Sequence, residues 1–350
     1  MRGISLYSGA GGMDRGFESA GVAVSAACEL NADAAAAFAA NFPSVRLAVG
    51  RVSDFVGSLE AGCADLVFGG PPCQGYSVAG KMDASDPRSA EVFVFLDAVG
   101  RVRPAVFVME NVDALAVLGK WRGTLDDIRA KAAALGYATW PVVLNAADFG
   151  VPQSRRRMFL FGSAALAEDD LRAAVEASLA ASRRPGGTVR DVLAASGPAG
   201  TPGNPATCTA KITYAANPVM RKSPYAGMLF NGAGRPLRLD APAPTMAAAT
   251  GGNKTHFVDE GEMFEGLPSF VEAYHAALAA GEAPRRGDAP ARLRRLTLVE
   301  AAALQTFPAG HRFSGSKSAR YRQIGNAVPC LLAEAVARSA RAASVGRRAA

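Results

Sequence analysis

The chain has 350 residues, and this length favours two domains over one because domains usually hold about 100–200 residues. Hydrophobic residues make up 49% and charged residues 20%, a composition that excludes a disordered chain, a collagen and a coiled coil. There are 38 Lys and Arg against 31 Asp and Glu, so the formal net charge is +7. Composition therefore indicates a folded protein with a sizeable core and an anionic partner.

The cysteines indicate neither a disulfide framework nor a zinc site, because the five are irregularly spaced and form no C-x-x-C pair. Four of them are expected to be inert packing residues: Cys28, Cys63, Cys208 and Cys330. The N-terminal MRGISLYSGAGG reaches glycines before a signal peptide could form, and no apolar run approaches the ~18–20 residues of a membrane span. The sequence predicts a cytoplasmic protein that is neither secreted nor membrane-spanning.

Short apolar runs alternate with helical patterns through the first half, which is typical of a parallel sheet with crossover helices. The predicted strands are Ile4–Tyr7, Val22–Cys28, Asp65–Phe68, Ala105–Met109, Trp140–Leu144 and Met158–Phe161. The predicted helices are Met13–Ala20, Asn31–Asn41, Ala90–Val102 and Thr124–Leu135. In such α/β sheets ligands bind at the carboxyl ends of the strands, so the chemistry is expected in the turns that follow them.

From about Arg183 the composition changes, because Pro and Gly cluster and the strand–helix alternation ends. This change predicts a catalytic and cofactor-binding domain over residues 1–184 and a second, smaller, irregular domain over 185–295. The segments LTLVEAAALQTF and AVPCLLAEAVARSARAA predict helices within residues 296–350. These helices are expected to dock back and complete the first domain.

A glycine-rich turn predicts a nucleoside site. Gly9, Gly11 and Gly12 lie between the first strand and the first helix, and Glu29 follows the second strand. Glycines let the backbone approach a ligand, the helix N-terminus favours a negative group, and the carboxylate accepts hydrogen bonds from ribose hydroxyls. The spacing does not complete G-x-G-x-x-G, which favours a mononucleoside such as S-adenosylmethionine over a dinucleotide. A turn without a ligand is the alternative.

The segment DLVFGGPPCQGYS predicts a reactive thiol. Cys73 follows a predicted strand and the pair Pro71–Pro72, which fixes the turn and can hold a sulfur at the mouth of the sheet. Glu110, in MENVDAL, falls at the carboxyl edge of the next predicted strand. A glutamate at a strand end is also compatible with a capping or surface role, so its pairing with Cys73 is a hypothesis.

Three arginines follow in NAADFGVPQSRRRMFLF. Arg155 and Arg157 occupy alternate positions of an extended segment, which places them on one face and Arg156 on the other. With Cys73 and Glu110 they make a nucleophile, an acid and a cationic clamp that are expected to converge on one ring. Solvated arginines are the alternative.

Taken in this order, the motifs resemble those of the DNA (cytosine-5)-methyltransferase family. SGAGG resembles its cofactor loop, PPCQGYS its nucleophile loop, ENV its glutamate motif, QSRRR its arginine motif and RQIGNAVP its C-terminal cofactor motif. The likeness covers roughly residues 1–162 and 292–340. It implies an α/β fold: a Rossmann-like S-adenosylmethionine-dependent methyltransferase sheet with a second, smaller target recognition domain.

The resemblance also implies a mechanism without a metal. The Cys73 thiolate adds to C6 of a flipped cytosine so that C5 can accept the methyl group, and Glu110 binds and protonates N3. Arg155 and Arg157 hold the base carbonyl and the active-site loop. Tyr7 stacks on the adenine of the cofactor. The cofactor-binding residues implied in this way are Tyr7, Gly9, Gly11, Gly12, Glu29, Pro72 and Asn326.

One position departs from the family pattern. Where the family usually has Gly-Asp-Ile after the third strand, with its Asp on the cofactor adenine, this chain has Gly50-Arg51-Val52. We expect Asp54, three residues after Arg51, to replace the missing contact.

DNA contacts are expected from two segments. Residues 74–91 are implied to form the catalytic loop, with DNA contacts from Gln74, Ser77 and Arg88. In the middle domain, GRPLRLDAPAPTMAAATGGNK is the most family-like part, and its expected DNA contacts are Arg235, Arg238, Gly251 and Gly252. Scattered solvated charges are the alternative.

The leading hypothesis is a sequence-specific bacterial-type DNA cytosine-5 methyltransferase, either part of a restriction–modification system or standing alone. Its expected partners are double-stranded DNA and a cognate restriction endonuclease, and it is expected to be a monomer. A tRNA cytosine-5 methyltransferase is a second hypothesis, although the Cys-Phe-Thr tripeptide of that branch is absent. A DNA-binding protein without turnover is a third.

Overall fold

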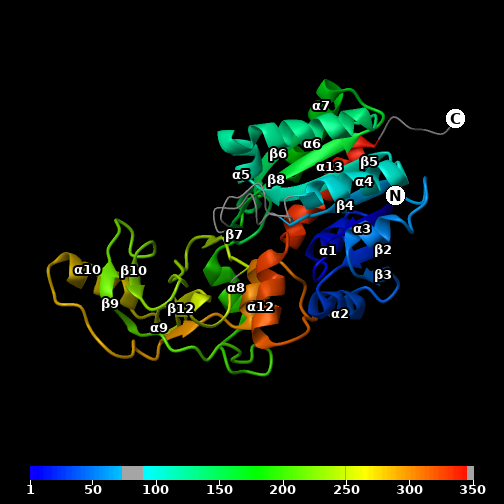
Figure 1. The fold of residues 1–350 in the computed structure, drawn as a ribbon. Helices are drawn as coiled ribbons and strands as arrows, with labels where there is room; N and C mark the ends of the chain where they lie inside the picture. Colours follow the sequence, from blue (N-terminus) through cyan, green and yellow to red (C-terminus); the bar gives the residue numbers. More distant parts are fainter. Residues whose placement is uncertain (73–89, 249, 345–350) are drawn as a thin grey trace.

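The computed structural model describes residues 1–72, 90–248 and 250–344. Its first half holds a seven-stranded sheet of order β3-β2-β1-β4-β5-β8-β6, in which β8 runs antiparallel to both of its neighbours (Figure 1). The strands are β1 (Arg2–Leu6), β2 (Ala23–Glu29), β3 (Arg46–Val49), β4 (Leu66–Gly69), β5 (Val106–Val112), β6 (Ala138–Asn145) and β8 (Arg156–Ser163). The predicted α/β class is confirmed, and every predicted strand has a counterpart within a few residues.

The central strands form because they are apolar along their whole length. Leu66, Val67 and Phe68 of β4 are fully buried, as are the residues from Val106 to Met109 of β5, a pattern expected of strands covered on both faces. β5 continues beyond its predicted end at Met109, because β8 pairs with it as far as Val112 and Arg157. Glu110 therefore lies within a paired strand and not at its end.

Helices cover both faces of the sheet. One apolar cluster joins the sheet to α1 (Gly12–Ser19), α2 (Ala32–Asn41), α7 (Glu168–Ser182) and α13 (Cys330–Ala343). The opposite cluster joins it to α3 (Val52–Val56), α4 (Glu91–Val102), α5 (Ala114–Val117) and α6 (Arg122–Ala134). Short 3-10 turns are η2 (Gly119–Trp121) and η3 (Ala146–Asp148). Within the described residues no helix has both the length and the apolar character to cross a membrane.

The C-terminal helix α13 packs against the sheet domain. α13 runs along α1, where a Cβ on Gly16 would come within 2.4 Å of the Cys330 carbonyl oxygen, so glycine is what permits this close approach. Helix α7 was not predicted, although Leu171, Val175 and Leu179 recur every four residues. The alanines between these residues reduce the difference in hydrophobicity between the two faces of the helix, so its apolar periodicity is weak.

The segment from residue 185 to 295, called the middle segment below, contains short elements and small sheets. Antiparallel pairs join β9 (Tyr214–Val219) to β10 (Met228–Phe230) and β12 (Phe257–Asp259) to β13 (Leu293–Arg295), while β11 (Ala243–Pro244) pairs with β7 (Gln153–Ser154). The other elements are α8 (Val189–Ser196), η4 (Gly252–Lys254), α9 (Glu260–Phe264) and α10 (Phe270–Ala279).

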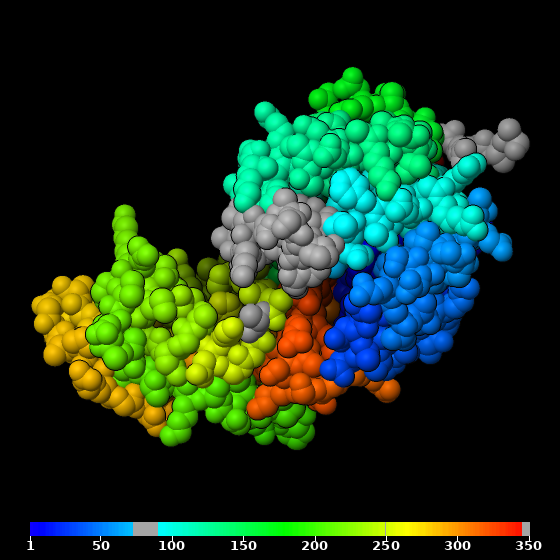
Figure 2. All heavy atoms as spheres, viewed as in Figure 1, coloured from blue at the N-terminus to red at the C-terminus, as the bar shows by residue number. Residues whose placement is uncertain are grey.

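Two further helices lie between the sheet domain and the middle segment. α11 (Leu298–Leu304) and α12 (Lys317–Asn326) share an apolar cluster with α8 of the middle segment. In Figure 2 the orange residues around α12 separate the blue N-terminal elements from the green and yellow middle segment. Of the C-terminal helices, α13 thus packs on the sheet domain, whereas α11 and α12 pack with the middle segment.

Candidate active site

A buried ion pair lies where β5 and β8 run side by side. Arg157 Nε is 3.0 Å from Glu110 Oε1, and the two side chains are only 17% and 14% exposed. Burial raises the pKa of Glu110, while the positive charges of Arg157 and Arg155 act in the opposite direction. The carboxyl group is therefore easier to protonate than an exposed glutamate, although a guanidinium orients it.

The same carboxyl group faces the segment that leads to Cys73. A Cβ on Gly70 would lie 2.8 Å from Glu110 Oε2, so glycine lets this segment pass directly against the carboxylate. Asn111 is buried, and its amide lies 3.4 Å from the Pro71 carbonyl oxygen. Cys73 itself lies outside the described residues. Pro72, the residue before it, is half-buried.

The three arginines of QSRRR have different partners. Arg155 is 2% exposed and donates to the carbonyls of Met246 and Gly325, both at 2.9 Å. Arg157 pairs with Glu110. The exposed Arg156 has its Nε 3.3 Å from Oδ2 of Asp113, the residue that precedes α5. Arg155 and Arg157 are thus largely buried, whereas Arg156 is exposed. Arg155, however, joins the middle segment to α12, next to the motif residue Asn326.

Gln153 strengthens this junction. Its Oε1 accepts from the Met246 amide at 3.1 Å and its Nε2 lies 3.4 Å from the Leu304 carbonyl oxygen. Because β7 also pairs with β11, the start of the arginine motif is fixed to the middle segment by both main chain and side chain. The sequence prediction passed over Gln153, yet it stands in the same motif as the arginines.

The loop between β1 and α1 has an unusual backbone. Tyr7, Gly9 and Gly11 all have positive φ angles, of 57°, 57° and 86°. The Tyr7 hydroxyl donates to Glu91 Oε2 at 2.8 Å, which fixes the ring by its tip to the first residue of α4, and burial raises the pKa of this hydroxyl. Glu91 was not singled out in the sequence, because nothing in its own surroundings indicates a partner so far along the chain.

The three glycines of this loop serve different purposes. A Cβ on Gly9 would meet nothing within 4 Å, so the space beside it is open to a ligand. A Cβ on Gly11 would lie 2.2 Å from the Phe42 ring, and one on Gly12 would lie 2.8 Å from the Val328 carbonyl oxygen. Gly11 and Gly12 are therefore required by internal packing.

Glu29 closes this loop at the end of β2. Its Oε2 accepts from the Gly9 amide at 2.8 Å and its Oε1 from the Asn31 amide at 2.7 Å. A carboxylate has about four acceptor positions, so it can still accept from a ligand hydroxyl. Opposite Glu29 in the sheet register lies Val49, which is 62% exposed, and Leu30 beside it is 63% exposed. An apolar surface thus adjoins the carboxylate.

Arg51 and Asp54 lie at the start of α3. Arg51 is the residue that precedes the first turn, and Asp54 lies within that turn, exposed. The nearby Gly50 has open space where a Cβ would stand. Asn326, at the end of α12, is exposed as well.

The residues expected to contact DNA are separated. Gln74, Ser77 and Arg88 lie outside the described residues. Gly251 and Gly252 have positive φ angles of 142° and 53°, and the nearest side chain to a Cβ on Gly251 would be Ser318 of α12, at 3.7 Å. This turn therefore lies against α12.

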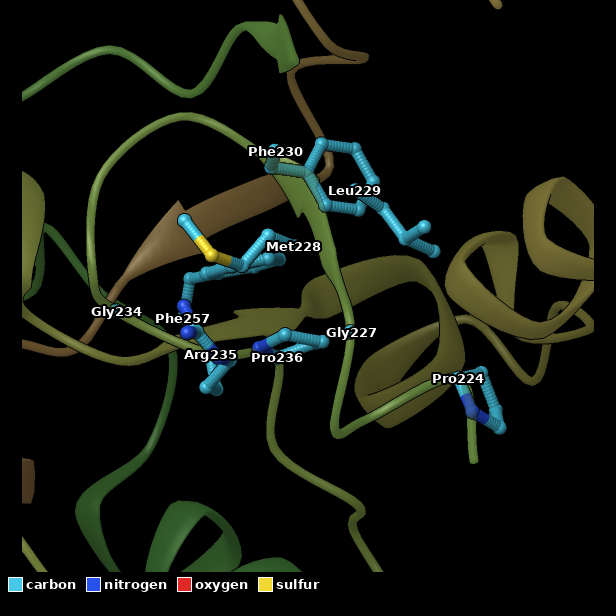
Figure 3. Close-up of a pocket in the computed structure, with 9 residues that line it drawn as sticks. All are labelled: Pro224, Gly227, Met228, Leu229, Phe230, Gly234, Arg235, Pro236 and Phe257. Carbon is cyan, nitrogen blue, oxygen red and sulfur yellow. The ribbon is translucent and has the colours of Figure 1, made fainter. Parts of the chain in front are cut away.

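Arg235 and Arg238 occupy different surroundings. Arg238 is exposed between the buried Leu237 and Leu239. Arg235 lies beside Met228 and Phe257 at a narrow crevice (Figure 3). Its guanidinium donates to the carbonyl of Ala233. Neither arginine forms an ion pair within the described residues.

The chain matches a family model in sequence. The model is described as C-5 cytosine-specific DNA methylase, and the match spans residues 1–342. Among curated proteins, type II methyltransferase M.HindV of Haemophilus influenzae is 32% identical over 340 residues, covering 96% of this chain and 95% of that protein. Type II methyltransferase M.XorII of Xanthomonas oryzae pv. oryzae is 32% identical over 363 residues, covering 95% and 83%.

Solved structures share the fold. A putative DNA modification methyltransferase encoded within a prophage of E. coli aligns with a TM-score of 0.62 at 21% identity, covering 97% of this chain and 98% of the other. The S. pombe Dnmt2 methyltransferase aligns with a TM-score of 0.62 at 18% identity, covering 97% and 96%. At these identities the likeness concerns the fold alone.

Proposed function

This chain belongs to the C-5 cytosine-specific DNA methylase family and is a DNA (cytosine-5)-methyltransferase, and on that premise we propose that the described groups around Glu110 form its base pocket. The observation that carries this assignment is the buried Glu110–Arg157 pair beside Gly70, three residues before Cys73. A protonatable carboxyl and a guanidinium thus lie beside the segment that leads, in the sequence, to the thiol of Cys73. Such a set suits a polar ring better than a phosphate or a metal.

In the proposed reaction the Cys73 thiolate forms a bond to C6 of the flipped cytosine. Glu110 donates a hydrogen bond and then a proton to N3 as electrons move onto the ring, which is favoured by the burial that raises its pKa. We assign the contact with the base carbonyl to Arg157, which lies beside Glu110, and we assign to Arg155 the role of holding the middle segment and α12 in place. Loss of the C5 proton and elimination of Cys73 release the product.

The family uses S-adenosylmethionine, and the residues at the end of β1 and β2 fit it. Gly9 opens a space, Glu29 retains acceptor positions for ribose hydroxyls, and Leu30 and Val49 offer an apolar surface to adenine. We propose that Tyr7, Pro72 and Asn326 complete this site and that Asp54 replaces the adenine contact of the residue that is Arg51 here. When bound, the cofactor supplies the methyl group that C5 receives.

We also propose that the substrate is a specific sequence in double-stranded DNA, read mainly by the middle segment. The curated relatives are named type II methyltransferases, which supports a partnership with a restriction endonuclease that cuts the same sequence. We propose a monomer acting in the cytoplasm, with Gln74, Ser77, Arg88, Gly251 and Gly252 at the DNA. The formal net charge of +7 suits such a polyanion.

The test is to incubate the protein with radiolabelled S-adenosylmethionine and either duplex DNA or tRNA. We expect label in DNA alone, and Glu110→Gln, which keeps the shape but cannot supply the proton, should lose nearly all of it. Conversion sequencing of DNA from a methylation-free host that expresses the protein should then show one modified sequence. Label in tRNA, or full activity of Glu110→Gln, would contradict the proposal.

A further inference from the structure

The cofactor loop receives a hydrogen bond from a residue 301 positions away in the chain. His311 follows α11, and its Nε2 lies 2.9 Å from the carbonyl oxygen of Ala10. Ala10 stands between Gly9 and Gly11, both with positive φ. Glycine neighbours make rotation of a peptide group inexpensive, because they have no Cβ to restrict φ. The peptide that carries the Ala10 carbonyl also bears the Gly11 N–H, which donates to the Ser8 carbonyl at 3.0 Å, so Ser8 and His311 hold its two ends.

The partners of Asn41 determine which ring nitrogen of His311 carries the proton. Asn41 Nδ2 lies 3.3 Å from His311 Nε2, but it already donates to the carbonyls of Ala37 at 2.7 Å and Arg312 at 2.8 Å. Its Oδ1 accepts from the Arg312 amide at 2.9 Å, which fixes the orientation of the side chain. An amide nitrogen has two hydrogens and a carbonyl can only accept. His311 Nε2 is therefore the donor to Ala10.

Aromatic rings hold the imidazole in this position. The ring centroid of His311 lies 4.5 Å from that of Phe307, 5.1 Å from Phe313 and 6.4 Å from Phe42. Burial lowers its pKa to about 4, so the ring is neutral near pH 7 and has a single N–H to donate. Phe42 also occupies the space that a Cβ on Gly11 would need. The same aromatic group thus supports both the histidine and the loop.

We propose that His311 is a positioning residue for the cofactor: its Nε2–H holds the Ala10 carbonyl and keeps the loop from Tyr7 to Gly11 in the shape that receives S-adenosylmethionine. The inference rests on the proposed function, which places the cofactor at this loop. His311 acts through Ala10 and does not touch the ligand. Without the donor, the Gly11 N–H bond to Ser8 still holds one end of this peptide, but the carbonyl end loses its partner, and cofactor binding must first restore its orientation.

The test compares two substitutions of His311 with a matched control. His311→Phe keeps an aromatic ring but removes the donor, whereas His311→Gln places an amide N–H near the position of Nε2. His275 in α10 makes the same kind of bond, Nε2 to the Arg221 carbonyl at 2.8 Å, so His275→Phe is the control. Calorimetry gives the Kd for S-adenosylmethionine, and steady-state assays at saturating DNA give KM and kcat.

We expect His311→Phe to raise Kd and KM for the cofactor about three- to tenfold, the effect of losing one neutral hydrogen bond, with kcat almost unchanged. His311→Gln should recover most of the affinity and His275→Phe should behave as the wild type. Equal affinity of His311→Phe and the wild type would overturn the proposal, and so would equal weakening in the Phe and Gln variants.

Two further outcomes are informative. If His311→Phe does not fold, His311→Asn takes its place, because the shorter amide does not reach Ala10, and the same difference from His311→Gln is required. A wild type that binds S-adenosylmethionine but methylates no DNA would contradict the proposed function while leaving the binding comparison valid.

Discussion

The sheet domain and the middle segment are stabilised by different kinds of interaction. In the sheet domain, fully buried strands such as Leu66–Gly69 lie between two apolar layers of helices. Burial of this kind contributes roughly 25 cal/mol per Å² without requiring any particular partner. The arrangement follows from continuous apolar runs in the central strands, and it places the carboxyl ends of β1, β2 and β4 at one edge.

The middle segment has small apolar clusters, around Leu237 and Phe230, and adds specific polar pairs to them. Asp259, 4% exposed, accepts from Arg292 at 2.6 and 2.9 Å. Arg294 donates to Glu260 at 2.6 Å and to Glu300 at 2.7 Å, and Glu300 is fully buried. Pairs of this kind fix loops without apolar periodicity. The proposed catalytic residues are thus positioned by the strands of a regular sheet. The proposed recognition surface is positioned by individual charged contacts.

Substitution of Cys73 should have the largest effect, and it should separate catalysis from DNA binding. Cys73→Ala should abolish methylation while DNA binding persists, because we assign the nucleophile to Cys73 and DNA recognition to the middle segment. DNA with 5-fluorocytosine at the target should form a covalent adduct with the wild type alone, since fluorine does not leave as a proton does. Gel retardation and a denaturing gel measure the two properties. Turnover in Cys73→Ala would contradict the mechanism.

The same comparison explains what the sequence could predict. The approximate positions of the strands and the residues Gly9 and Glu29 follow from apolar runs and the turns after them. The order of the strands in the sheet was not predicted, and Glu110 lies inside β5 and not in the turn after it. The pairing of Arg157 with Glu110 could not be derived, because it depends on β8 being antiparallel and in register with β5. Contacts between residues far apart in the chain, such as Arg155 with Gly325, leave no trace in local spacing.

A stability measurement should show that the middle segment depends on its charged pairs. Arg294→Leu removes the cation beside the buried Glu300 and should destabilise the protein by about 3–5 kcal/mol, the cost of leaving a buried charge without its partner. Urea unfolding measures the change. Arg338→Leu, which breaks an exposed pair with Glu334 on α13, is the control and should cost under about 1 kcal/mol. Equal destabilisation by Arg294→Leu and Arg338→Leu would mean that the buried pair of the middle segment contributes no more to stability than the pair on α13.

In the sheet domain, removal of the charge of Asp14 should stabilise the protein instead of destabilising it. This residue of α1 is fully buried with no ion pair among the described residues, and burial raises its pKa from the usual 3.8 to about 7. The folded state therefore binds more protons between those two values, so stability falls as pH rises from about 4 to about 7. Asp14→Asn should stabilise the protein by roughly 2–4 kcal/mol at pH 8 and by less at pH 5.

Urea unfolding at pH 5 and pH 8 tests this sign. The exposed Asp126 of α6 provides the control, because Asp126→Asn should not change the free energy of unfolding appreciably at either pH. Destabilisation by Asp14→Asn at pH 8 would mean that the ionised carboxylate is needed, and the sheet domain would then resemble the middle segment in this respect.

The smallest expected effect concerns how the middle segment reads DNA. Arg238 is exposed, whereas Arg235 is half-buried and donates to the Ala233 carbonyl, and neither forms an ion pair within the described residues. We predict that at least one binds a guanine edge. Its change to Ala should cost about 1–3 kcal/mol of discrimination at one base pair, while leaving binding to other sequences nearly unchanged.

Binding of Arg235→Ala and Arg238→Ala to the cognate site and to single-substitution sites should be measured across a salt series. A phosphate contact differs from a base contact because it weakens all sequences alike and lowers the salt slope by about one. Uniform weakening by both variants would therefore assign the arginines to the DNA backbone. Discrimination would then have to come from other exposed side chains of the middle segment, and its charged pairs would serve to shape a surface rather than to present these two arginines.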